Sequence, residues 1–461
     1  MKIIFPERVY GIETEYGCML QKNGIVVPLD RWPQQFLQKH YAYHVNRFSC
    51  IFTVLGEFWD TRGSRTYVDR NHPEHSTPEA RSVRDAVIYS RAGDMRMREL
   101  FRHPTSGIKA LLFKNNCARQ NNFGQLSSFA CHENYFAPGD RTPYDNPSFL
   151  PFLMTRQILD GSGSWSDTDA FFLSQRARAL GRPINQGGCY HILAPGFKPK
   201  RLHLQYGDSN MLDVAAFLKL GTTSLLLPFL ESRFISPIEC ANSLKDYGQV
   251  SARGAAEPVI YITSFNRKMS ALDIQFFYLD FIRRHISSIV FASDEIEAES
   301  LMILQLWERA LNAIAANDTD WMFGRIDWMT KKMLYERAVA RAQASSKTEN
   351  IDALRATIDL MYHSIMDECM RDRIFACKPE CCLAFDAEME HAMHCPPKGT
   401  RAQVRGALIK KILEMHPWQN LKIGWDMMVW DQAKDFRRYV MQDPFDAAIP
   451  DDLEHAVKYF L

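Results

Sequence analysis

Glu13 and Glu15 stand two positions apart within residues 7–19, a segment in which apolar and polar side chains alternate. This alternation predicts a strand with one buried face, and residues two apart on a strand project from the same face. Two neighbouring carboxylates repel each other unless a proton or a cation lies between them, and magnesium prefers oxygen ligands. A solvated strand face carries the same pattern, so the pair alone leaves a metal site and an ordinary surface both open.

A second group of polar side chains starts at Arg65. Arg65, Tyr67 and Asp69 would share one face of a strand, because they are spaced two apart. A bend at Pro73 would then bring Glu74 back towards that face. An arginine, carboxylates and a hydroxyl are groups that hold a metal-bound nucleotide. A polar loop held together by salt bridges is the alternative.

His132 and Glu133 form a third candidate pair in the segment CHENY. Adjacent residues on a strand point to opposite faces, so at most one of the two side chains points into a given site. An isolated pair of this kind is more often structural than functional.

The elements that must position these residues follow from hydrophobic periodicity. Strands are predicted at 110–116 and 200–206, and a helix is predicted at 79–101. Apolar stripes at helical spacing then cover four later segments: 271–292, 294–316, 325–345 and 349–370. These stripes favour a packed core over a cofactor-binding surface. The predicted fold class is α+β, with an antiparallel sheet and a cluster of helices.

The C-terminal third contains a break and a small mixed unit. Residues 378–399 are rich in Cys, His and Pro and predict a break between helices, whereas 400–461 predict a small unit of helices and strands. The break and the residues before it place several potential zinc ligands close together: Cys369, Cys377, Cys381, Cys382, His391, His394 and Cys395. Their spacing matches no common zinc site, so buried reduced thiols are favoured and zinc stays an alternative.

Composition excludes several classes of function. The 461 residues include 55 basic and 54 acidic side chains, a balance that argues against a nucleic-acid binder or a membrane-surface protein. Pro6 and Glu7 precede any apolar run long enough for a signal peptide, and no stretch approaches the roughly 20 apolar residues of a spanning helix. Eleven cysteines without a secretory signal indicate reduced thiols and a cytoplasmic location.

A series of motifs in order along the chain resembles the Pup ligase and Pup deamidase family: GIETEYG, YVDxxHPExSTPE, FKNN, CHENY, LSQRA, GDSNM, KLGTT, IDW, PPKGTRAQVRG and DQAKDFRRYVMQDPFDA. The resemblance runs from residue 8 to about residue 446. It implies the glutamine synthetase type of fold, in which a curved antiparallel sheet cradles ATP and metal ions. A catalytic domain at 1–385 and a small C-terminal domain at 386–461 are expected.

The resemblance also implies roles for single residues. Magnesium would be held by Glu13, Tyr67 and Glu74, with Glu15 and His132 completing a second metal position. Asp69 would be the catalytic base. The residues expected to contact ATP are Arg65, Thr77 and Trp425, and those expected to face its phosphates are Arg176, Arg401 and Arg405. Arginine suits that task because it stays charged and forms forked hydrogen bonds to oxyanions.

These roles form a consistent chemical sequence. A carboxylate is a poor electrophile, and transfer of the ATP γ-phosphoryl group turns it into an acyl phosphate with a good leaving group. Magnesium and arginine neutralise the charge that spreads over the transferred group. An amine then attacks after a nearby base takes its proton. The expected partners are a small disordered protein modifier ending in Glu or Gln and a lysine-bearing acceptor.

One segment departs from the family pattern. After Asn185 the family has Thr-Arg-Asp-Glu-Pro-His, whereas this chain has Gln-Gly-Gly-Cys-Tyr-His over 186–191. Arg119, in a lengthened segment before CHENY, is a candidate to replace the missing arginine. The departure predicts weak ligation of standard Pup with ATP binding retained. It leaves two other functions open: a ligase for small carboxylates and amines, and an ATP-binding homologue without ligase activity.

Overall fold

The computed structural model describes residues 2–27, 49–53, 55–69, 72–102, 107–119, 126–138, 143, 146–166, 170–180, 201–235, 238–240, 243–344, 350–415, 420–432 and 435–460. The chain folds into two compact units, and each combines segments that are distant in sequence. We call them the sheet unit (Val9–Phe113, Ile365–Asp367 and Ala384–Leu461) and the helix-rich unit (Met1–Arg8, Lys114–Ser364 and Glu368–Leu383).

Antiparallel strands form the centre of the sheet unit. They are hydrogen-bonded in the order β2 (Tyr10–Glu15), β8 (His72–Ser76), β7 (Arg65–Asp69), β6 (Phe58–Asp60) and β5 (Cys50–Phe52). In this register Glu15 faces Glu74, which in turn faces Tyr67. Because directly paired residues project from the same face of a sheet, one face collects the polar residues and the other packs inward.

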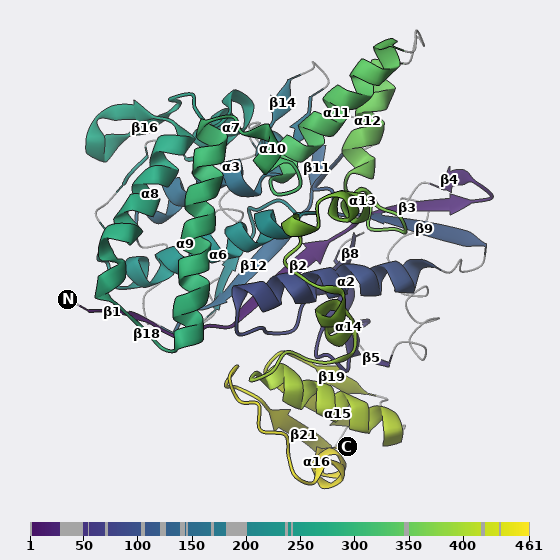
Figure 1. Cartoon of the computed structure of the whole chain (residues 1–461). Helices are drawn as coiled ribbons and strands as arrows, with labels where there is room; N and C mark the ends of the chain where they lie inside the picture. Colours follow the sequence, from purple (N-terminus) through teal and green to yellow (C-terminus); the bar gives the residue numbers. More distant parts are fainter. Residues whose placement is uncertain are drawn as a thin grey trace. The chain divides into compact units, whose positions relative to one another are not determined.

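Helix α2 (Val83–Arg102) covers the inward face of these strands (Figure 1). His75 from β8 fits against Gly93, where an added Cβ would come within 2.4 Å of the imidazole ring. Tyr16 donates a hydrogen bond of 2.8 Å from its hydroxyl to Asp94 of the same helix. A second sheet in this unit has the order β4 (Ile25–Val27), β3 (Gly17–Lys22) and β9 (Ile108–Phe113).

The C-terminal part of the sheet unit packs around an apolar core that includes Ile51 of β5 and Trp59 of β6. Its elements are α14 (Asp386–His394), α15 (Arg401–Met415), β19 (Leu421–Ile423), β20 (Met427–Gln432), β21 (Asp435–Val440) and α16 (Leu453–Phe460). Helix α15 lies close to the turn between β6 and β7, where a Cβ on Gly406 would meet the carbonyl oxygen of Thr61 at 2.2 Å. The predicted mixture of helices and strands in 400–461 is therefore confirmed, and its standing as a separate unit stays a prediction.

The helix-rich unit carries most of the remaining helices. They are α3 (Phe149–Asp160), α4 (Gln175–Leu180), α6 (Asp213–Glu231), α7 (Ser243–Arg253), α8 (Ala271–His285), α9 (Asp294–Ala315), α10 (Thr319–Met322), α11 (Asp327–Ala344), α12 (Ile351–Met361) and α13 (Met370–Cys377). Its longest strands, β12 (Cys131–Phe136) and β15 (Arg201–Leu204), pair in antiparallel fashion.

The shorter strands of this unit form four two-stranded ladders. These are β1 (Ile3–Phe5) with β18 (Ile289–Phe291), β10 (Cys117–Arg119) with β11 (Leu126–Ser128), β13 (Ser164–Trp165) with β14 (Phe171–Phe172), and β16 (Ile260–Ile262) with β17 (Arg267–Met269).

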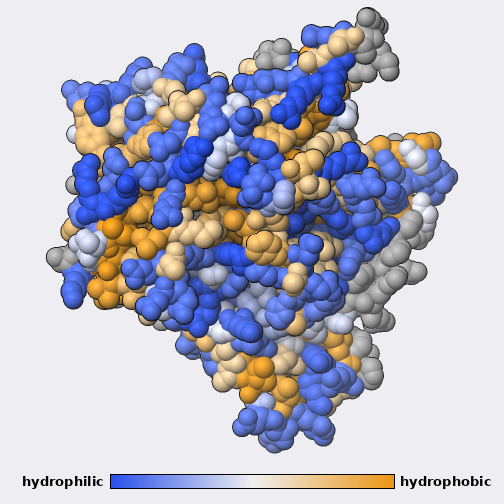
Figure 2. Space-filling model, viewed as in Figure 1, coloured by the Kyte–Doolittle hydropathy of each residue, from blue (hydrophilic) through white to orange (hydrophobic). Residues whose placement is uncertain are grey.

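Helix α6 passes the test of length and hydropathy for a membrane span, although 94% of its apolar window is buried inside the protein. The prediction that no stretch is long and apolar enough was therefore wrong for this helix. Its burial explains the composition, because a helix that is apolar all round is expected in a core. Figure 2 shows that hydrophilic side chains cover most of the face in view, with apolar patches among them.

The predicted α+β class is confirmed, and three local predictions need correction. The stretch 271–292 is not one helix, because α8 ends at His285 and residues 289–291 form strand β18. The stretch 349–370 is not one helix, because α12 ends at Met361 and α13 begins at Met370. The break at 378–399 contains α14, whose Met389, Ala392 and Met393 pack on α2. The Cys, His and Pro content hid this helical spacing. The predicted domain boundary after residue 385 stays a prediction.

Candidate nucleotide and metal site

One face of strands β2, β8 and β7 carries a dense group of acidic side chains. We call it the carboxylate face and define it by Glu13, Glu15, Tyr67, Asp69 and Glu74. One carboxylate oxygen from each of Glu15, Asp69 and Glu74 lies within 4.8 Å of the other two. The prediction that Tyr67 and Asp69 share a strand face is confirmed by the ladder between β7 and β8.

Pro73 does not make the predicted bend. It lies inside β8 and pairs with Val68, and the connection between the two strands falls at residues 70–71, outside the described residues. The carbonyl of Pro73 accepts a hydrogen bond of 2.8 Å from Tyr16 N. Proline has no N–H to return this bond, and the carbonyl oxygen of Tyr16 bonds instead to His72 Nδ1 at 3.2 Å. The hairpin as a whole, and not a local bend, returns Glu74 to the face.

The electrostatics of this face favour a bound cation. Glu74 is 1% exposed, and burial, followed by the negative charge of Glu13, raises the pKa of its carboxyl group well above the usual value. The Tyr67 hydroxyl donates a hydrogen bond to Glu74, and burial together with that carboxylate raises the pKa of Tyr67. A magnesium ion would relieve this repulsion, because it prefers hard oxygen ligands of the kind that these side chains supply.

Arg65 lies at the edge of the carboxylate face. Its guanidinium group donates a hydrogen bond to Glu57 and lies 3.8 Å from the centroid of the Tyr67 ring. Contact with a carboxylate and an aromatic ring fixes the plane of the guanidinium group. The predicted nucleotide contact thus stands directly beside the predicted metal ligands.

Thr77 closes the ladder between β2 and β8. Its hydroxyl oxygen accepts a hydrogen bond of 2.9 Å from Ile12 N, and its own N–H donates to Ile12 O at 2.9 Å. The next pair of hydrogen bonds joins Tyr10 to Ala80, so one extra residue is accommodated between the two pairs. Such a bulge redirects the chain next to a site.

Glu79, inside this bulge, forms a buried ionic cluster with two predicted phosphate-facing arginines. Arg401 approaches Glu79 at 2.7 Å, and Arg405 forms a second ion pair with it. Burial alone would raise the pKa of Glu79, but Arg405 and Arg401 outweigh it and hold that pKa below the usual value. Arg405 is fully buried, so the structure places it in a supporting cluster; its predicted role towards phosphate stays a prediction.

Trp425 belongs to the same cluster. Arg405 donates a hydrogen bond of 2.8 Å to the carbonyl oxygen of Trp425 and lies 4.9 Å from the centroid of its ring. The Trp425 ring also contacts Trp59 of β6 edge-on, at a centroid distance of 4.9 Å. Trp425 is half-buried, so its ring combines a fixed position with an open side.

Arg176 lies in the helix-rich unit, within a buried polar network. Its guanidinium group donates to Ser128 Oγ at 3.0 Å and to Gln205 O at 2.8 Å. Its N–H donates to Asp208, which accepts four further hydrogen bonds, from Ser162 N, Ser162 Oγ, Ser174 Oγ and Gln175 N. Asp208 therefore fixes the start of α4, and Arg176 is held in place by both its backbone and its side chain.

The motifs FKNN, LSQRA, GDSNM and IDW meet in this network. Asn116 N donates to the side chain of Gln175 at 2.5 Å, and Asn116 also bonds to Ser209. Asn210 donates to Asp327 at 3.0 Å. Burial raises the pKa of Asp327 to about 6, although it accepts hydrogen bonds from neutral donors. These motif residues therefore act as an internal scaffold.

The prediction for the His132–Glu133 pair is confirmed. Glu133 is buried in an ion pair with Arg156 at 2.5 Å, while His132 lies on the opposite face of β12 and is partly exposed. The His132 ring contacts His203 edge-on at 5.0 Å, and His203 bonds to Asn134 at 2.7 Å. This face of β12 and β15 therefore offers imidazole nitrogen atoms that could coordinate a metal.

Sequence reasoning missed the roles of Glu57 and Glu79. Glu79 stood within a quoted motif, but its arginine partners lie more than 300 positions away, and no local pattern points to them. The altered segment 186–191 lies outside the described residues, and of Arg119 the structure describes only its place at the end of β10.

The predicted zinc alternative receives no support from the described residues. The described part of the chain contains two groups of potential metal ligands, and neither includes a cysteine from the 369–395 cluster. Burial raises the pKa of Cys369 and of Cys381, as expected for thiols that stay protonated. The predicted burial is wrong for Cys377, which is exposed.

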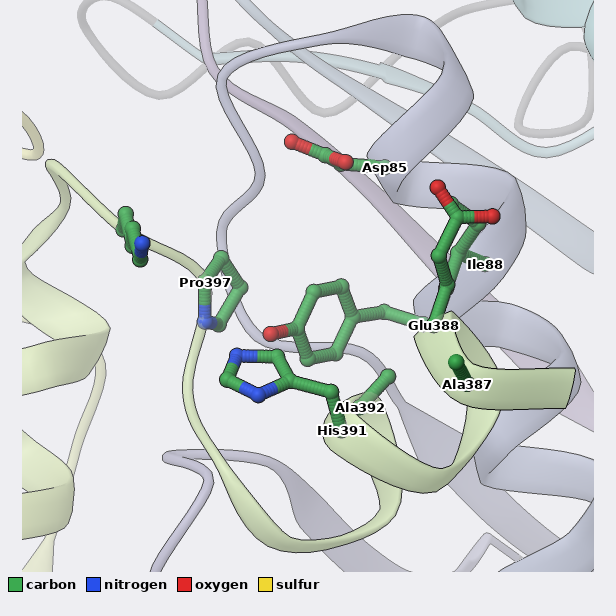
Figure 3. A pocket seen from close by; sticks show the side chains of 9 residues that line it. Asp85, Ile88, Ala387, Glu388, His391, Ala392 and Pro397 are labelled. Atoms are coloured by element: carbon green, nitrogen blue, oxygen red, sulfur yellow. The ribbon is translucent and has the colours of Figure 1, made fainter. Parts of the chain in front are cut away.

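A separate hollow of about 360 Å³ opens between α2 and α14 in the sheet unit (Figure 3). Asp85, Tyr89, Glu388, His391 and Lys398 contribute polar groups to its wall. The two carboxylate oxygens of Glu388 accept hydrogen bonds of 2.7 Å from the guanidinium group of Arg84, so this carboxylate joins α14 to α2. The hollow is distinct from the carboxylate face.

Comparison with known proteins places this geometry in a family. The Pup-ligase protein family model matches residues 8–429. The Pup–protein ligase of Acidimicrobium ferrooxidans is 30% identical over 95% of this chain and 96% of its own length. The depupylase of Acidothermus cellulolyticus is 31% identical over 80% of this chain and 74% of its own length.

Solved structures give the same result for the fold. The Pup ligase PafA, in its complex with the prokaryotic ubiquitin-like protein Pup, superposes with a TM-score of 0.82 and 24% identity, covering 98% of this chain and 92% of that chain. PafA in complex with ADP superposes with a TM-score of 0.74 and 24% identity, covering 92% of this chain and 93% of that chain.

The fold and the family relationship together define an enzyme of the ATP-dependent ligase class with a glutamine synthetase-like fold. The chain belongs to the Pup-ligase protein family. The family predicted from the motifs is therefore confirmed, and the two alternative functions are not favoured.

Proposed function

We propose that this protein uses magnesium and ATP to phosphorylate the terminal side-chain carboxylate of a Pup-like modifier, and that it forms or hydrolyses the isopeptide bond between the modifier and a lysine. The observation that carries the proposal is the burial of Glu74 beside Glu13, Glu15 and Asp69, a grouping of like charges that calls for a cation. The family relationship to Pup–protein ligases and a depupylase supplies the substrate. A cytoplasmic location is part of the proposal.

The carboxylate face would hold the metal. Glu13, Tyr67 and Glu74 would bind one magnesium ion, and Glu15 with His132 would contribute to a second position. Bound magnesium would supply neutralisation of phosphate charge during transfer. Tyr67 has a further task that its own contacts support, because its hydroxyl orients the Glu74 carboxylate by a hydrogen bond.

The nucleotide would lie beside Arg65. The guanidinium plane of Arg65 is held by Glu57 and by Tyr67, so it meets a phosphate without further ordering. Thr77 and Trp425 would contact the nucleotide, with the ring of Trp425 offering a stacking surface. Arg401 and Arg405 would act through Glu79 and Trp425, to which they are already bonded.

Asp69 would act as the general base, and Arg176 would face the transferred phosphoryl group. The lysine nitrogen attacks the carbonyl carbon of the acyl phosphate, its proton passes to Asp69, and inorganic phosphate leaves. Asp69 is exposed on the carboxylate face, where an acceptor lysine can reach it. In the reverse-acting reaction the same carboxylate would assist cleavage of the amide or isopeptide bond.

The test is incubation of the protein with magnesium, ATP, a Pup-like protein ending in Glu or Gln, and a lysine-bearing acceptor. Mass spectrometry should detect a new isopeptide bond, with ADP and phosphate released in equal amounts, or the cleavage of a preformed conjugate. Omission of magnesium should abolish either reaction. Turnover of free glutamate and a small amine, with none of the modifier, would contradict the proposed substrate.

A further inference from the structure

Ser76 has the position of a ligand-binding residue, although no role has been assigned to it above. It is the last residue of β8 and pairs with Glu13 on one side and with Arg65 on the other. Pairing puts its side chain on the carboxylate face, two positions along the strand from Glu74. The residue is 1% exposed.

The hydroxyl group of Ser76 is buried without a hydrogen-bonding partner among the described residues. Buried hydroxyl groups nearly always have a partner, because leaving one unpaired costs the free energy of its desolvation. An unpaired hydroxyl on a face that is otherwise built of functional groups therefore indicates a missing ligand atom.

Arg65 supplies a second donor in the same position. Its Nε atom is also buried and has no acceptor within the described part of the chain, while another of its nitrogen atoms is bonded to Glu57. Directly paired residues in an antiparallel ladder have Cβ atoms about 4.5–5.5 Å apart, so both donors can reach one atom. A guanidinium nitrogen only donates, so the shared partner must be an acceptor.

We propose that Ser76 Oγ and Arg65 Nε together bind one non-bridging phosphate oxygen of the nucleotide. The inference rests on the proposed function and adds Ser76 as a positioning residue for phosphate. An anionic oxygen fits better than a carbonyl oxygen, because it accepts from two donors and its charge is balanced by Arg65. Ser76 thereby fixes the phosphate next to the carboxylates that would hold magnesium.

The experiment compares Ser76→Ala with wild type and with Ser90→Ala, a control that removes another buried serine from α2 in the same unit. Calorimetry measures binding of Mg-ADP and Mg-ATP. The Sp and Rp forms of ATPαS and ATPβS then probe single phosphate oxygen atoms. Thermal denaturation without nucleotide reports the fold.

We expect Ser76→Ala to weaken nucleotide binding about tenfold to a hundredfold, as for loss of a hydrogen bond to a charged group. At one phosphate position, wild type and Ser90→Ala should bind one of the two diastereomers, Sp or Rp, more tightly than the other. Ser76→Ala should bind both equally. Should Ser76→Ala not fold, Ser76→Cys keeps the side-chain volume and donates only weakly, and it should show the same losses.

Nucleotide affinity and diastereomer preference equal to wild type would overturn the inference, because the hydroxyl would then bind only water or serve the fold. In that case the proposed function would stand, since wild type would still bind Mg-ATP. Absence of Mg-nucleotide binding in wild type itself would overturn the proposed function and this inference together.

Discussion

Two groups of buried acidic residues in this protein differ in what surrounds them. In the helix-rich unit, Glu133 is matched by Arg156, and Asp208 accepts five hydrogen bonds. On the carboxylate face of the sheet unit, the charges that act on Glu74 come from Glu13, Glu15 and Asp69.

The difference separates a scaffold from a binding site. An internally balanced group is complete in the folded chain, so its contribution is to stability and to the position of neighbouring elements. A group of like charges is held together by the rest of the fold at a cost in stability, and that cost is recovered when a ligand binds. Mutations should therefore affect stability in the first group and ligand binding in the second.

Among the variants that test this difference, we expect the largest change in Mg-ATP binding from Glu74→Gln. The variant keeps the shape of the side chain and removes the charge at the centre of the carboxylate face, so Mg-ATP binding should be lost. Without nucleotide, the variant should be at least as stable as wild type, because a repelled buried charge is gone. Calorimetry and thermal denaturation measure the two quantities.

Glu231→Gln is the matched control for this variant, because Glu231 is paired with Arg8 at 2.5 Å in the helix-rich unit. It should lower stability and leave Mg-ATP affinity unchanged. If Glu74→Gln bound Mg-ATP as tightly as wild type, the proposed metal site on the carboxylate face would be wrong.

Asp69→Asn should reduce turnover about 10²–10⁴-fold, the range for loss of a general base. Mg-ATP affinity should stay near that of wild type if Asp69 acts as a base alone. Because an Asp69 oxygen lies within 4.8 Å of oxygens from Glu15 and Glu74, the binding measurement has a second use. A parallel loss of Mg-ATP affinity would assign Asp69 to the metal, and normal turnover would exclude it from the mechanism.

Arg156→Leu tests the balanced group. Removing the arginine leaves Glu133 and Asp160 buried without their ion pair, with Lys219 as a cation that still acts on them, and should cost about 3–5 kcal/mol of stability. Arg283→Leu is the control, since the ion pair between Arg283 and Glu308 is exposed and its loss should matter much less. Chemical denaturation measures both variants. Equal stability of Arg156→Leu and wild type would show that the scaffold role is wrong.

The smallest expected effect concerns His75, on the inward face behind the carboxylates. Burial, followed by repulsion from Arg62, lowers the pKa of His75 from 6.5 to about 3. The folded protein therefore binds fewer protons than the unfolded chain between these values, and stability from His75 is complete above pH 6.5 and falls as pH drops towards 3.

His75→Gln, which does not titrate, should show a flatter decline of stability over this range than wild type. The pKa of Asp60 is lowered to about 2 from 3.8: burial opposes the shift, and Arg62 drives it, so its contribution falls at lower pH. Denaturation midpoints at pH 7, 6, 5 and 4 separate the two residues. Identical pH profiles for the variant and wild type would show that folding does not lower the pKa of His75.

The sequence was sufficient for the elements with a strong local period. Strand β7 and the shared face of Tyr67 and Asp69 followed from a spacing of two, and helices α9 and α11 followed from their apolar stripes. The family followed from the order of its motifs. Helix α14 was missed because Cys, His and Pro residues masked its short apolar stripe.

What the sequence alone determined was the inventory of chemical groups: carboxylates on one strand face, arginines for phosphate and a base among them. Tertiary structure decided which of these charged groups are paired with an opposite charge or with hydrogen-bond donors inside the protein. Ladder register set Ser76 between Glu13 and Arg65, and the fold brought Arg405 to Glu79 across more than 300 positions. Burial and charge pairing depend on contacts between distant segments, and no local pattern encodes them, so only the folded chain distinguishes a scaffold carboxylate from one that awaits a ligand.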